Sequence, residues 1–388
     1  MTEFEQVIQQ YPLFYLTATD QNTFASVALK ILSLNKKLIL LPSSENKTDL
    51  RLVYTDDCTS LFVPSIQTKS DDFYIGMMTS GSTEAPRIFA FEKFKIDYTL
   101  DWYKKIYNIT NNSIILSSMP TSYNFSFVAG ILNANRNNAQ YQYLPPADLC
   151  DFIKINANKY DKTVILANPI ILDILSQKQF EANGNILIDS GGAPLSTKAI
   201  KMFREKGFDL HEGYGLTETA SLTHFDQEAS EKSLGTVGYP VDSSIHVELE
   251  TVENKPMVKI FSPNIGRHVD LEGKFIDESS SCYLTTDIGR FDADGRLVLV
   301  GRSSDVSING FYPKDTLEII ADILGFKCAL VQHLVNKTVN IRLFDPELLS
   351  YEEQFKQKVS DALNIPMNSV SVDHVSGLLH SLKLKRKK

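Results

Sequence analysis

Four hydroxyl side chains, a glycine and a cation lie close together in the segment Thr79-Ser80-Gly81-Ser82-Thr83-Glu84-Ala85-Pro86-Arg87. The apolar run 73–78 precedes it and predicts a buried strand. A strand that opens into such a loop offers backbone N–H groups and hydroxyls to an anion, and Arg87 adds positive charge. The Walker pattern is absent because no G-K-[ST] follows. The segment predicts a loop that holds nucleotide phosphates, with a polar surface turn as the structural alternative.

A second segment, Glu212-Gly213-Tyr214-Gly215-Leu216-Thr217-Glu218-Thr219, places a tyrosine between two glycines. We expect this arrangement to expose the ring face of Tyr214, which would let it stack on a purine. Thr217 offers a hydroxyl to a phosphate, and Glu218 offers a carboxylate to Mg²⁺, which prefers oxygen ligands. The alternative is a glycine-rich turn that carries a surface tyrosine.

A third segment, Ser190-Gly191-Gly192-Ala193-Pro194-Leu195, follows the apolar run 186–189, which predicts a buried strand. Its two glycines allow the backbone to come close to a flat ligand. Taken alone, the segment is also consistent with an ordinary turn from a strand to a helix.

The three segments resemble signatures of the adenylate-forming superfamily. This superfamily includes acyl- and aryl-CoA synthetases, adenylation domains of peptide synthetases, and luciferases. The first resembles T-S-G-[ST]-T-G-x-P-K, with Glu84 in place of glycine and Arg87 in place of lysine. The second contains Y-G-x-T-E without a mismatch, and the third matches G-[GA]-[AE]-P-L. The resemblance covers residues from about 24 to the C-terminus, with a front end shorter than that of full-length relatives.

The resemblance implies a nucleotide site and extends to Tyr283–Asp287 and Arg302, which resemble Y-x-T-G-D…G-R with Thr286 in place of glycine. In the family the aspartate and the arginine hold the ribose, and a buried carboxylate can accept two sugar hydroxyls. A surface salt bridge is the alternative for Asp287 and Arg302. The nucleotide contacts implied are Thr79, Ser80, Gly81, Ser82, Thr83, Arg87, Gly191, Gly192, Ala193, Glu212, Gly213, Tyr214, Gly215, Asp287 and Arg302.

The C-terminal segment 380–387 resembles S-G-K-[IL]-x-R-K, with Leu382 in place of glycine and Lys383 at the catalytic lysine. An ammonium there would stabilise charge that develops in the transition state. The alternative is a solvated basic tail. Asp305 is the expected hinge, in a stretch a few residues shorter than in the family.

The segment Ser118–Phe125 resembles the family segment beside the acyl pocket, and it places Tyr123 and Asn124, with Gly191, at the acid substrate. Amino-acid-activating relatives hold an aspartate at the position of Asn124, and an asparagine cannot pair with an ammonium in the same way. The resemblance therefore favours an aryl or fatty acid over an amino acid.

The implied reaction is the attack of a carboxylate on the α-phosphate of Mg·ATP, which gives acyl-AMP and pyrophosphate. The acyl group would then pass to a thiol of CoA or of a carrier-protein phosphopantetheine. The catalytic set implied is Lys383, Thr217, Glu218 and Tyr123, with Glu218 as the Mg²⁺ ligand. The substitutions at Glu84, Arg87, Thr286 and Leu382 leave an alternative, a non-catalytic relative that binds a nucleotide or a partner protein as a scaffold.

Composition limits the other classes. The 388 residues contain 39 Lys and Arg against 47 Asp and Glu, a net charge of −8, which argues against binding of nucleic acid. The four cysteines are far apart and show no metal-ligand spacing, which favours free thiols in a reducing compartment. No signal-peptide pattern or bilayer-spanning apolar run is present, so we expect a cytoplasmic protein without membrane insertion or a nucleic-acid partner.

The helices and strands expected to position these residues indicate an α/β fold with two domains. Apolar periodicity alternates between helix and strand up to about residue 234, which favours a largely parallel sheet, and then changes to antiparallel strands. A polar run at Ser303–Asp305 divides an N-terminal adenylate-forming domain, 1–303, from a small mobile α+β domain, 304–388. The expected helices are 24–34, 98–106, 127–132, 171–175, 314–324 and 350–363; the expected strands are 37–42, 61–64, 73–78, 114–120, 164–169, 186–189, 244–250, 257–261, 296–300, 329–334, 339–344 and 370–375.

Overall fold

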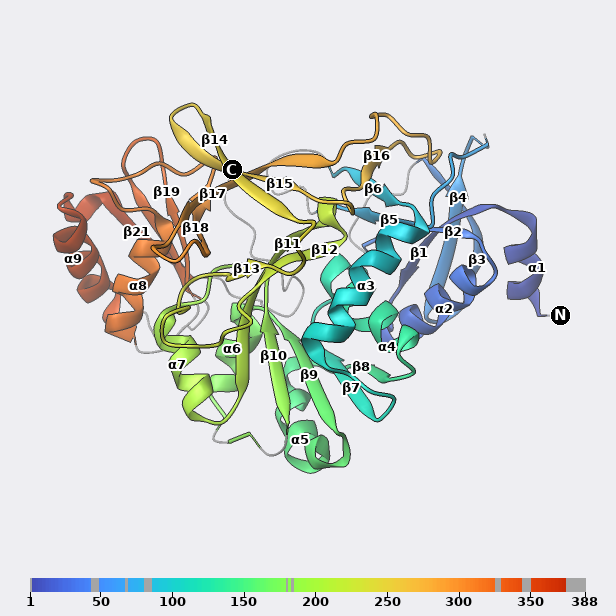
Figure 1. The fold of residues 1–388 in the computed structure, drawn as a ribbon, viewed down its shortest axis with the longest axis horizontal. Coiled ribbons are helices and arrows are strands. Elements are labelled where there is room, and N and C mark those ends of the chain that lie inside the picture. The colour runs from blue at the N-terminus through green and yellow to red at the C-terminus, as the bar shows by residue number, and fades with distance from the viewer. Residues whose placement is uncertain are drawn as a thin grey trace.

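The computed structural model describes residues 2–42, 49–66, 69–79, 86–178, 181–182, 185–324, 329–343 and 350–374. Within these ranges the strands form two seven-stranded sheets, a four-stranded sheet and a three-stranded sheet. Figure 1 shows the first sheet at one end of the molecule, the second in the middle and the three-stranded sheet at the other end. The α/β fold class is confirmed, since both large sheets carry parallel strands and pack against helices.

The first sheet is mixed and has the strand order β16-β6-β5-β2-β1-β4-β3. Strand β1 lies next to the central strand β2 and is buried at every position, and the apolar side of α2 packs against it. The elements are α1 Glu3–Gln10, β1 Leu13–Ala18, α2 Gln21–Ser33, β2 Lys37–Leu40, β3 Leu50–Thr55, β4 Thr59–Pro64, β5 Ile75–Met78, β6 Ile88–Phe91 and β16 Arg267–Val269.

The second sheet has the order β13-β12-β11-β10-β9-β7-β8 and is parallel from β8 to β11. Between its parallel strands the chain crosses over through helices, as parallel pairing requires. The expected helix 127–132 is a π-helix, in which residues 126–132 are all buried. The elements are α3 Lys93–Tyr107, β7 Ser113–Ser117, π-helix η1 Phe125–Leu132, α4 Asn133–Arg136, β8 Gln140–Tyr143, α5 Pro146–Asn156, 3₁₀ η2 Ala157–Lys159, β9 Lys162–Ala167, α6 Pro169–Ser176, β10 Ile186–Ser190, α7 Thr197–Glu205, β11 Asp209–Leu216, 3₁₀ η3 Thr217–Thr219, β12 Ser221–Phe225 and β13 Tyr239–Pro240.

The change to antiparallel strands is confirmed in the third sheet, which has the order β14-β15-β17-β18. A final unit follows, in which α8 and α9 pack with β19, β20 and β21 around a hydrophobic cluster of its own. We call this the C-terminal unit. The elements of both parts are β14 His246–Val252, β15 Lys255–Phe261, β17 Cys282–Phe291, β18 Leu297–Arg302, α8 Pro313–Leu324, β19 Ala329–His333, β20 Val339–Leu343, α9 Glu352–Leu363, 3₁₀ η5 Met367–Ser369 and β21 Val370–His374.

Two further properties of the described part bear on the expectations from composition. Cys58, Cys150 and Cys282 are free thiols, as expected, and Cys328 lies outside the described residues. None of the described helices is long and apolar enough to cross a bilayer.

Candidate active site

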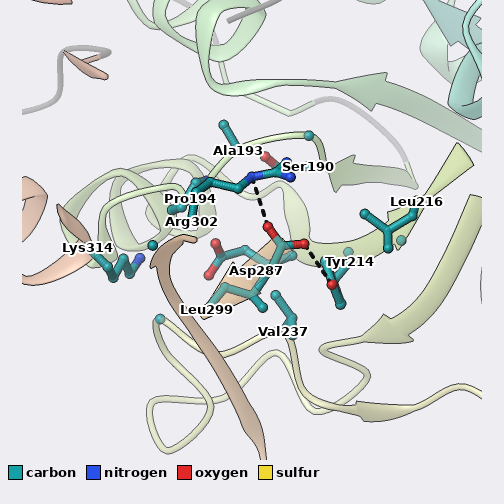
Figure 2. Close-up of a pocket in the computed structure, with 16 residues that line it drawn as sticks. Ser190, Ala193, Pro194, Tyr214, Leu216, Val237, Asp287, Leu299, Arg302 and Lys314 are labelled. Atoms are coloured by element: carbon teal, nitrogen blue, oxygen red, sulfur yellow. Dashed lines mark hydrogen bonds and ion pairs between the residues drawn. The ribbon is translucent and has the colours of Figure 1, made fainter. Parts of the chain in front are cut away.

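A pocket opens where the ends of β10 and β11 meet β18 and the start of α8 (Figure 2). It joins segments from three of the predicted motifs, although they lie far apart in the sequence. Its lining residues are Ser190, Gly192, Ala193, Pro194, Glu212, Gly213, Tyr214, Gly215, Leu216, Gly235, Val237, Leu299, Gly301, Asp287, Arg302 and Lys314.

Asp287 links two elements inside the pocket. One carboxylate oxygen accepts a hydrogen bond from the Tyr214 hydroxyl at 2.8 Å, and the other pairs with the Arg302 Nε at 2.9 Å (Figure 2). Register places Asp287 directly opposite Arg302 on β17 and β18, so both side chains reach the pocket from neighbouring strands. The Asp287 carboxylate raises the pKa of Arg302. Asp287 is only 5% exposed, whereas the Arg302 side chain is 41% exposed, so the pair joins a buried carboxylate to a partly exposed guanidinium.

Tyr214 lines the pocket, but it does not expose its ring as expected. It lies in a strand rather than a turn, and it is 6% exposed. Burial and the neighbouring Asp287 raise the pKa of its hydroxyl well above the usual value. The tyrosine therefore presents a fixed, neutral edge of the pocket wall and orients the Asp287 carboxylate.

Thr286 and Asp305 fix the backbone around this pair. Thr286 stands where the family signature has glycine, and its Oγ1 accepts a hydrogen bond from Arg302 Nη1 at 3.0 Å. Asp305 is buried and accepts hydrogen bonds from the Arg302 N–H at 2.6 Å and the His333 N–H at 3.4 Å. Asp305 thus ties β18 to β19 of the C-terminal unit.

Glu212 and Ser190 form a polar patch on the pocket wall. One Glu212 oxygen accepts a hydrogen bond from the Leu195 N–H at 3.3 Å. The other oxygen, Oε2, and the Ser190 hydroxyl are buried and have no hydrogen-bond partner among the described residues. Burial raises the pKa of Glu212, while the nearby Lys314 ammonium opposes that rise. Buried polar groups are normally bonded, so these two groups are suited to a ligand.

Glu218 lies just outside this pocket, in the short helix after β11. Its Oε1 accepts a hydrogen bond from the Tyr283 hydroxyl at 3.0 Å, and burial raises its pKa. In the described part of the chain, no group of three or more His, Cys, Asp or Glu side chains could hold a metal ion by itself. A single carboxylate still fits Mg²⁺, which usually keeps its waters and binds through one or two carboxylates plus substrate phosphates.

Thr79 and Arg87 close the first predicted loop. The Thr79 N–H donates to the Arg87 carbonyl at 2.8 Å, and the Arg87 N–H donates to Thr79 Oγ1 at 3.0 Å. The chain therefore returns as the antiparallel strand β6 directly after β5. Arg87 acts on the Glu218 carboxylate and opposes the rise in its pKa, so the loop ends near the expected metal ligand. Ser80, Gly81, Ser82 and Thr83 lie outside the described residues, as does Lys383.

The expected acid-binding residues gather next to the pocket. The Asn124 side-chain N–H donates a hydrogen bond to the Leu216 carbonyl at 3.0 Å. This bond anchors the start of the π-helix to the end of β11. The Phe125 ring packs so closely on Gly191 that a Cβ there would lie 3.2 Å from it. Tyr123 is half-buried against the main core, and burial raises its pKa.

Of the predicted nucleotide contacts, the pocket brings together Gly192, Ala193, Glu212, Gly213, Tyr214, Gly215, Asp287 and Arg302. Gly191, Thr79 and Arg87 do not line it. Sequence reasoning missed Gly235, Val237 and Lys314, which also line it. Gly235 and Val237 belong to no motif that we recognised, and Lys314 read as an ordinary residue at the start of a helix.

Asp189, directly before the Ser190 motif, should make stability depend on pH. Its carboxyl accepts a hydrogen bond from the Tyr107 hydroxyl, its Oδ1 has no partner among the described residues, and burial raises its pKa to about 7. The folded state therefore holds a proton that the unfolded state, at 3.8, releases, so stability falls as pH rises from about 4 to 7.

Asp189→Asn removes this dependence, because its amide oxygen can accept the same hydrogen bond and does not ionise. We expect the stability of the variant relative to wild type to rise by up to about 1.4 kcal/mol per pH unit between pH 4 and 7. Urea unfolding at several pH values measures this. Asp209→Asn tests the opposite sign below about pH 4, since hydrogen bonding to His211 lowers the pKa of Asp209 from 3.8. A constant difference between Asp189→Asn and wild type across this range would contradict the prediction.

Comparison with known proteins gives one family. The model of the AMP-binding enzyme family matches residues 14–259. Oxalate–CoA ligase of Arabidopsis thaliana is 26% identical over 271 residues, which cover 66% of this chain and 52% of that protein. 2-Succinylbenzoate–CoA ligase of Bacillus subtilis is 28% identical over 178 residues, 42% of this chain and 36% of that protein. The matches thus span about half or less of the length of these curated relatives.

Solved structures show the same fold. The o-succinylbenzoate CoA synthetase of Bacillus subtilis, in complex with its acyl-adenylate intermediate, superposes with a TM-score of 0.69 at 17% identity. The superposition covers 99% of this chain and 91% of that one. A benzoate CoA ligase of Burkholderia xenovorans gives a TM-score of 0.65 at 14% identity, covering 99% and 81%.

Proposed function

Since this chain belongs to the AMP-binding enzyme family, we propose that it activates a carboxylic acid with ATP to give an acyl-adenylate. The observation that supports this most directly is the buried Asp287, whose carboxylate is bonded to Tyr214 and Arg302 inside the pocket. A carboxylate held in this way has lone pairs fixed in place for the hydroxyls of a ribose. The acyl-adenylate is named as the bound intermediate of the synthetase from Bacillus subtilis.

The residues would divide the work as follows. The patch of Glu212 and Ser190 offers acceptors and a hydroxyl to the base, while Asp287 and Arg302 hold the ribose. Thr79 and Arg87 fix the ends of the phosphate loop, and Thr217 offers its hydroxyl to a phosphate. Glu218, held by Tyr283, would bind Mg²⁺, which when bound neutralises phosphate charge. Lys383 would stabilise the charge that develops as the carboxylate attacks the α-phosphate.

The acid substrate is an aryl or fatty acid in this proposal. The Asn124 amide nitrogen is already used by the Leu216 carbonyl, and asparagine has no charge to pair with an ammonium. Phe125 adds aromatic surface beside Gly191, which suits an apolar acyl group. Tyr123, two residues earlier, is half-buried against the main core. The names of the relatives, 2-succinylbenzoate–CoA ligase and benzoate CoA ligase, are those of enzymes for aromatic acids.

We propose that a thiol then takes the acyl group, from CoA or from the phosphopantetheine of an acyl carrier protein. A domain boundary at Ser303–Asp305 would separate residues 1–303 from 304–388, since the C-terminal unit has its own hydrophobic cluster. Asp305, bonded to both sides, is the proposed hinge. The free thiols fit the proposed cytoplasmic location.

Carboxylate-dependent exchange of pyrophosphate into ATP tests the function. The acid panel holds benzoates, cinnamates, short and long fatty acids, and amino acids. We expect exchange with aryl or fatty acids and a loss of at least about 100-fold in Lys383→Ala, because a preorganised charge contributes about that much. Lys385→Ala, in the same basic cluster, is the matched control and should keep wild-type exchange. If the protein binds ATP but no acid supports exchange, the scaffold alternative replaces the ligase.

A further inference from the structure

Lys314 lines the pocket although it belongs to the C-terminal unit (Figure 2). Its side chain is 6% exposed, which is rare for a lysine and requires compensation of its charge. The ammonium pairs with Glu318 at 3.2 Å, one turn further along α8, and it donates to the Leu195 carbonyl in the loop before α7. One cation thus bridges α8 and the pocket wall.

Glu318 forms the second contact between α8 and the pocket wall, and we call the contacts of Lys314 and Glu318 the joint. Its carboxylate accepts hydrogen bonds from the Thr197 N–H at 3.0 and 3.1 Å and from the Thr197 hydroxyl at 2.8 Å. Thr197 is the first residue of α7, where backbone N–H groups have no partner within the helix and favour an anion. The C-terminal unit is therefore attached beside the pocket by charged and polar contacts, several of which meet at Lys314 and Glu318.

Glu212 connects this joint to the ligand space. Glu212 Oε1 accepts a hydrogen bond from the Leu195 N–H, and Lys314 donates to the Leu195 carbonyl, so both charged side chains bond the same residue. The Lys314 ammonium also opposes the rise in the pKa of Glu212 that burial causes. The Oε2 atom of Glu212 lies in the pocket wall without a partner among the described residues. A bound base with an amino N–H can donate to this oxygen and favours the ionised carboxylate. An ionised Glu212 in turn attracts Lys314 and thus the whole of α8.

We infer that Lys314 is a positioning residue that couples nucleotide binding to docking of the C-terminal unit through Glu212. The inference rests on the proposed function, because the pocket must take a nucleotide. Coupling of this kind is reciprocal: the nucleotide tightens the joint, and the docked unit tightens nucleotide binding by the same factor. Each side stabilises the ionised form of Glu212.

The test uses the full chain with AMP as the probe. Calorimetry measures AMP affinity, and hydrogen exchange measures protection of the Thr197 N–H. In wild type we expect AMP to slow exchange at Thr197 by roughly 10-fold, within the usual range of coupling. In Lys314→Met we expect AMP to bind about 10-fold more weakly and to give no added protection. Lys356→Met, on α9 of the same unit, breaks ion pairs with Glu352 and Glu353 and should behave as wild type.

A pH profile separates coupling from a general loss of structure. Glu212 is faced by Lys314 and Glu318 from α8, by Asp226 after β12, and by the Leu195 N–H. Without the Lys314 ammonium, Glu212 should take up a proton at higher pH, so the pH at which AMP affinity halves should rise by about one unit or more. Glu318→Gln removes a like charge from the same cluster and should not raise this pH.

The outcomes are distinct. Loss of AMP-dependent protection in Lys314→Met, together with the raised pH midpoint, supports the coupling. If both proteins bind AMP and show equal protection at Thr197, the coupling is wrong while the nucleotide site stands. If wild type binds neither AMP nor ATP, the proposed function fails and the coupling fails with it.

Discussion

Asp287→Ala should lower the affinity for ATP by at least about 100-fold while the protein stays folded. The carboxylate bonds to Tyr214 and Arg302 at once and is the proposed acceptor for the ribose hydroxyls. Each hydrogen bond to a charged group contributes about 1.5–3 kcal/mol, so losing two of them costs about 3 kcal/mol or more. The variant also leaves the Arg302 charge without its partner. Calorimetric titration with ATP measures the loss.

Asp292→Ala provides the matched control. Asp292 pairs with Arg296 at 2.7 Å in the connection between the same two strands, β17 and β18, but it does not line the pocket. Both variants break an Asp–Arg pair of this sheet, so only Asp287→Ala should weaken ATP binding. Equal ATP affinity in Asp287→Ala and wild type would remove Asp287 from the nucleotide site.

Gly215→Ala should destabilise the fold by about 3 kcal/mol or more, because an added Cβ would lie 1.8 Å from the Ser221 carbonyl oxygen. The neighbour is backbone and cannot turn away as a side chain would. A bulge between Tyr214 and Gly215 brings β11 and β12 this close, and Ser221 itself has an unusual φ of 102°. Relief of the clash must shift the strand that carries Tyr214. Urea unfolding with a folded-state probe measures the change.

Gly295→Ala is the control for the loss of a glycine. Gly295 has φ 85° and open space around its added Cβ, so only the backbone penalty of about 1 kcal/mol applies. Both substitutions restrict the unfolded chain equally, and the difference between them isolates the clash. If Gly215→Ala unfolds at the same urea concentration as Gly295→Ala, the bulge is not tightly packed.

The sequence predicted those elements whose apolar residues recur with a clear period. Strand β10 and helix α8 lie within a residue or two of their predicted positions. Strand β1, Leu13–Ala18, was missed although it is a mostly apolar run buried on both faces, like the predicted strand β10. Helix η1 was predicted as a regular helix over 127–132, since that apolar run is consistent with any helical period.

The site was predictable where a motif is continuous, and less so where it is assembled in space. Asp287 and Arg302 were assigned from the resemblance to the family signature, and cross-strand register brings them together. The burial of Tyr214 was not predicted, because flanking glycines suggest a turn and do not reveal the strand on either side. No sequence pattern marked Lys314 as a site residue. Its role depends on how α8 packs against α7, which no local pattern encodes.

Strand β16 has a consequence for the order in which the protein folds during synthesis. It pairs with β6 and completes the edge of the first sheet, yet it leaves the ribosome long after the rest of that sheet. The Tyr15 hydroxyl likewise finds its acceptor only in the Leu271 carbonyl. The growing chain must therefore keep β6 as an open edge while the second sheet is made, and open edges invite pairing with other chains. This edge of the first sheet therefore stays unpaired until residues 267–271 emerge.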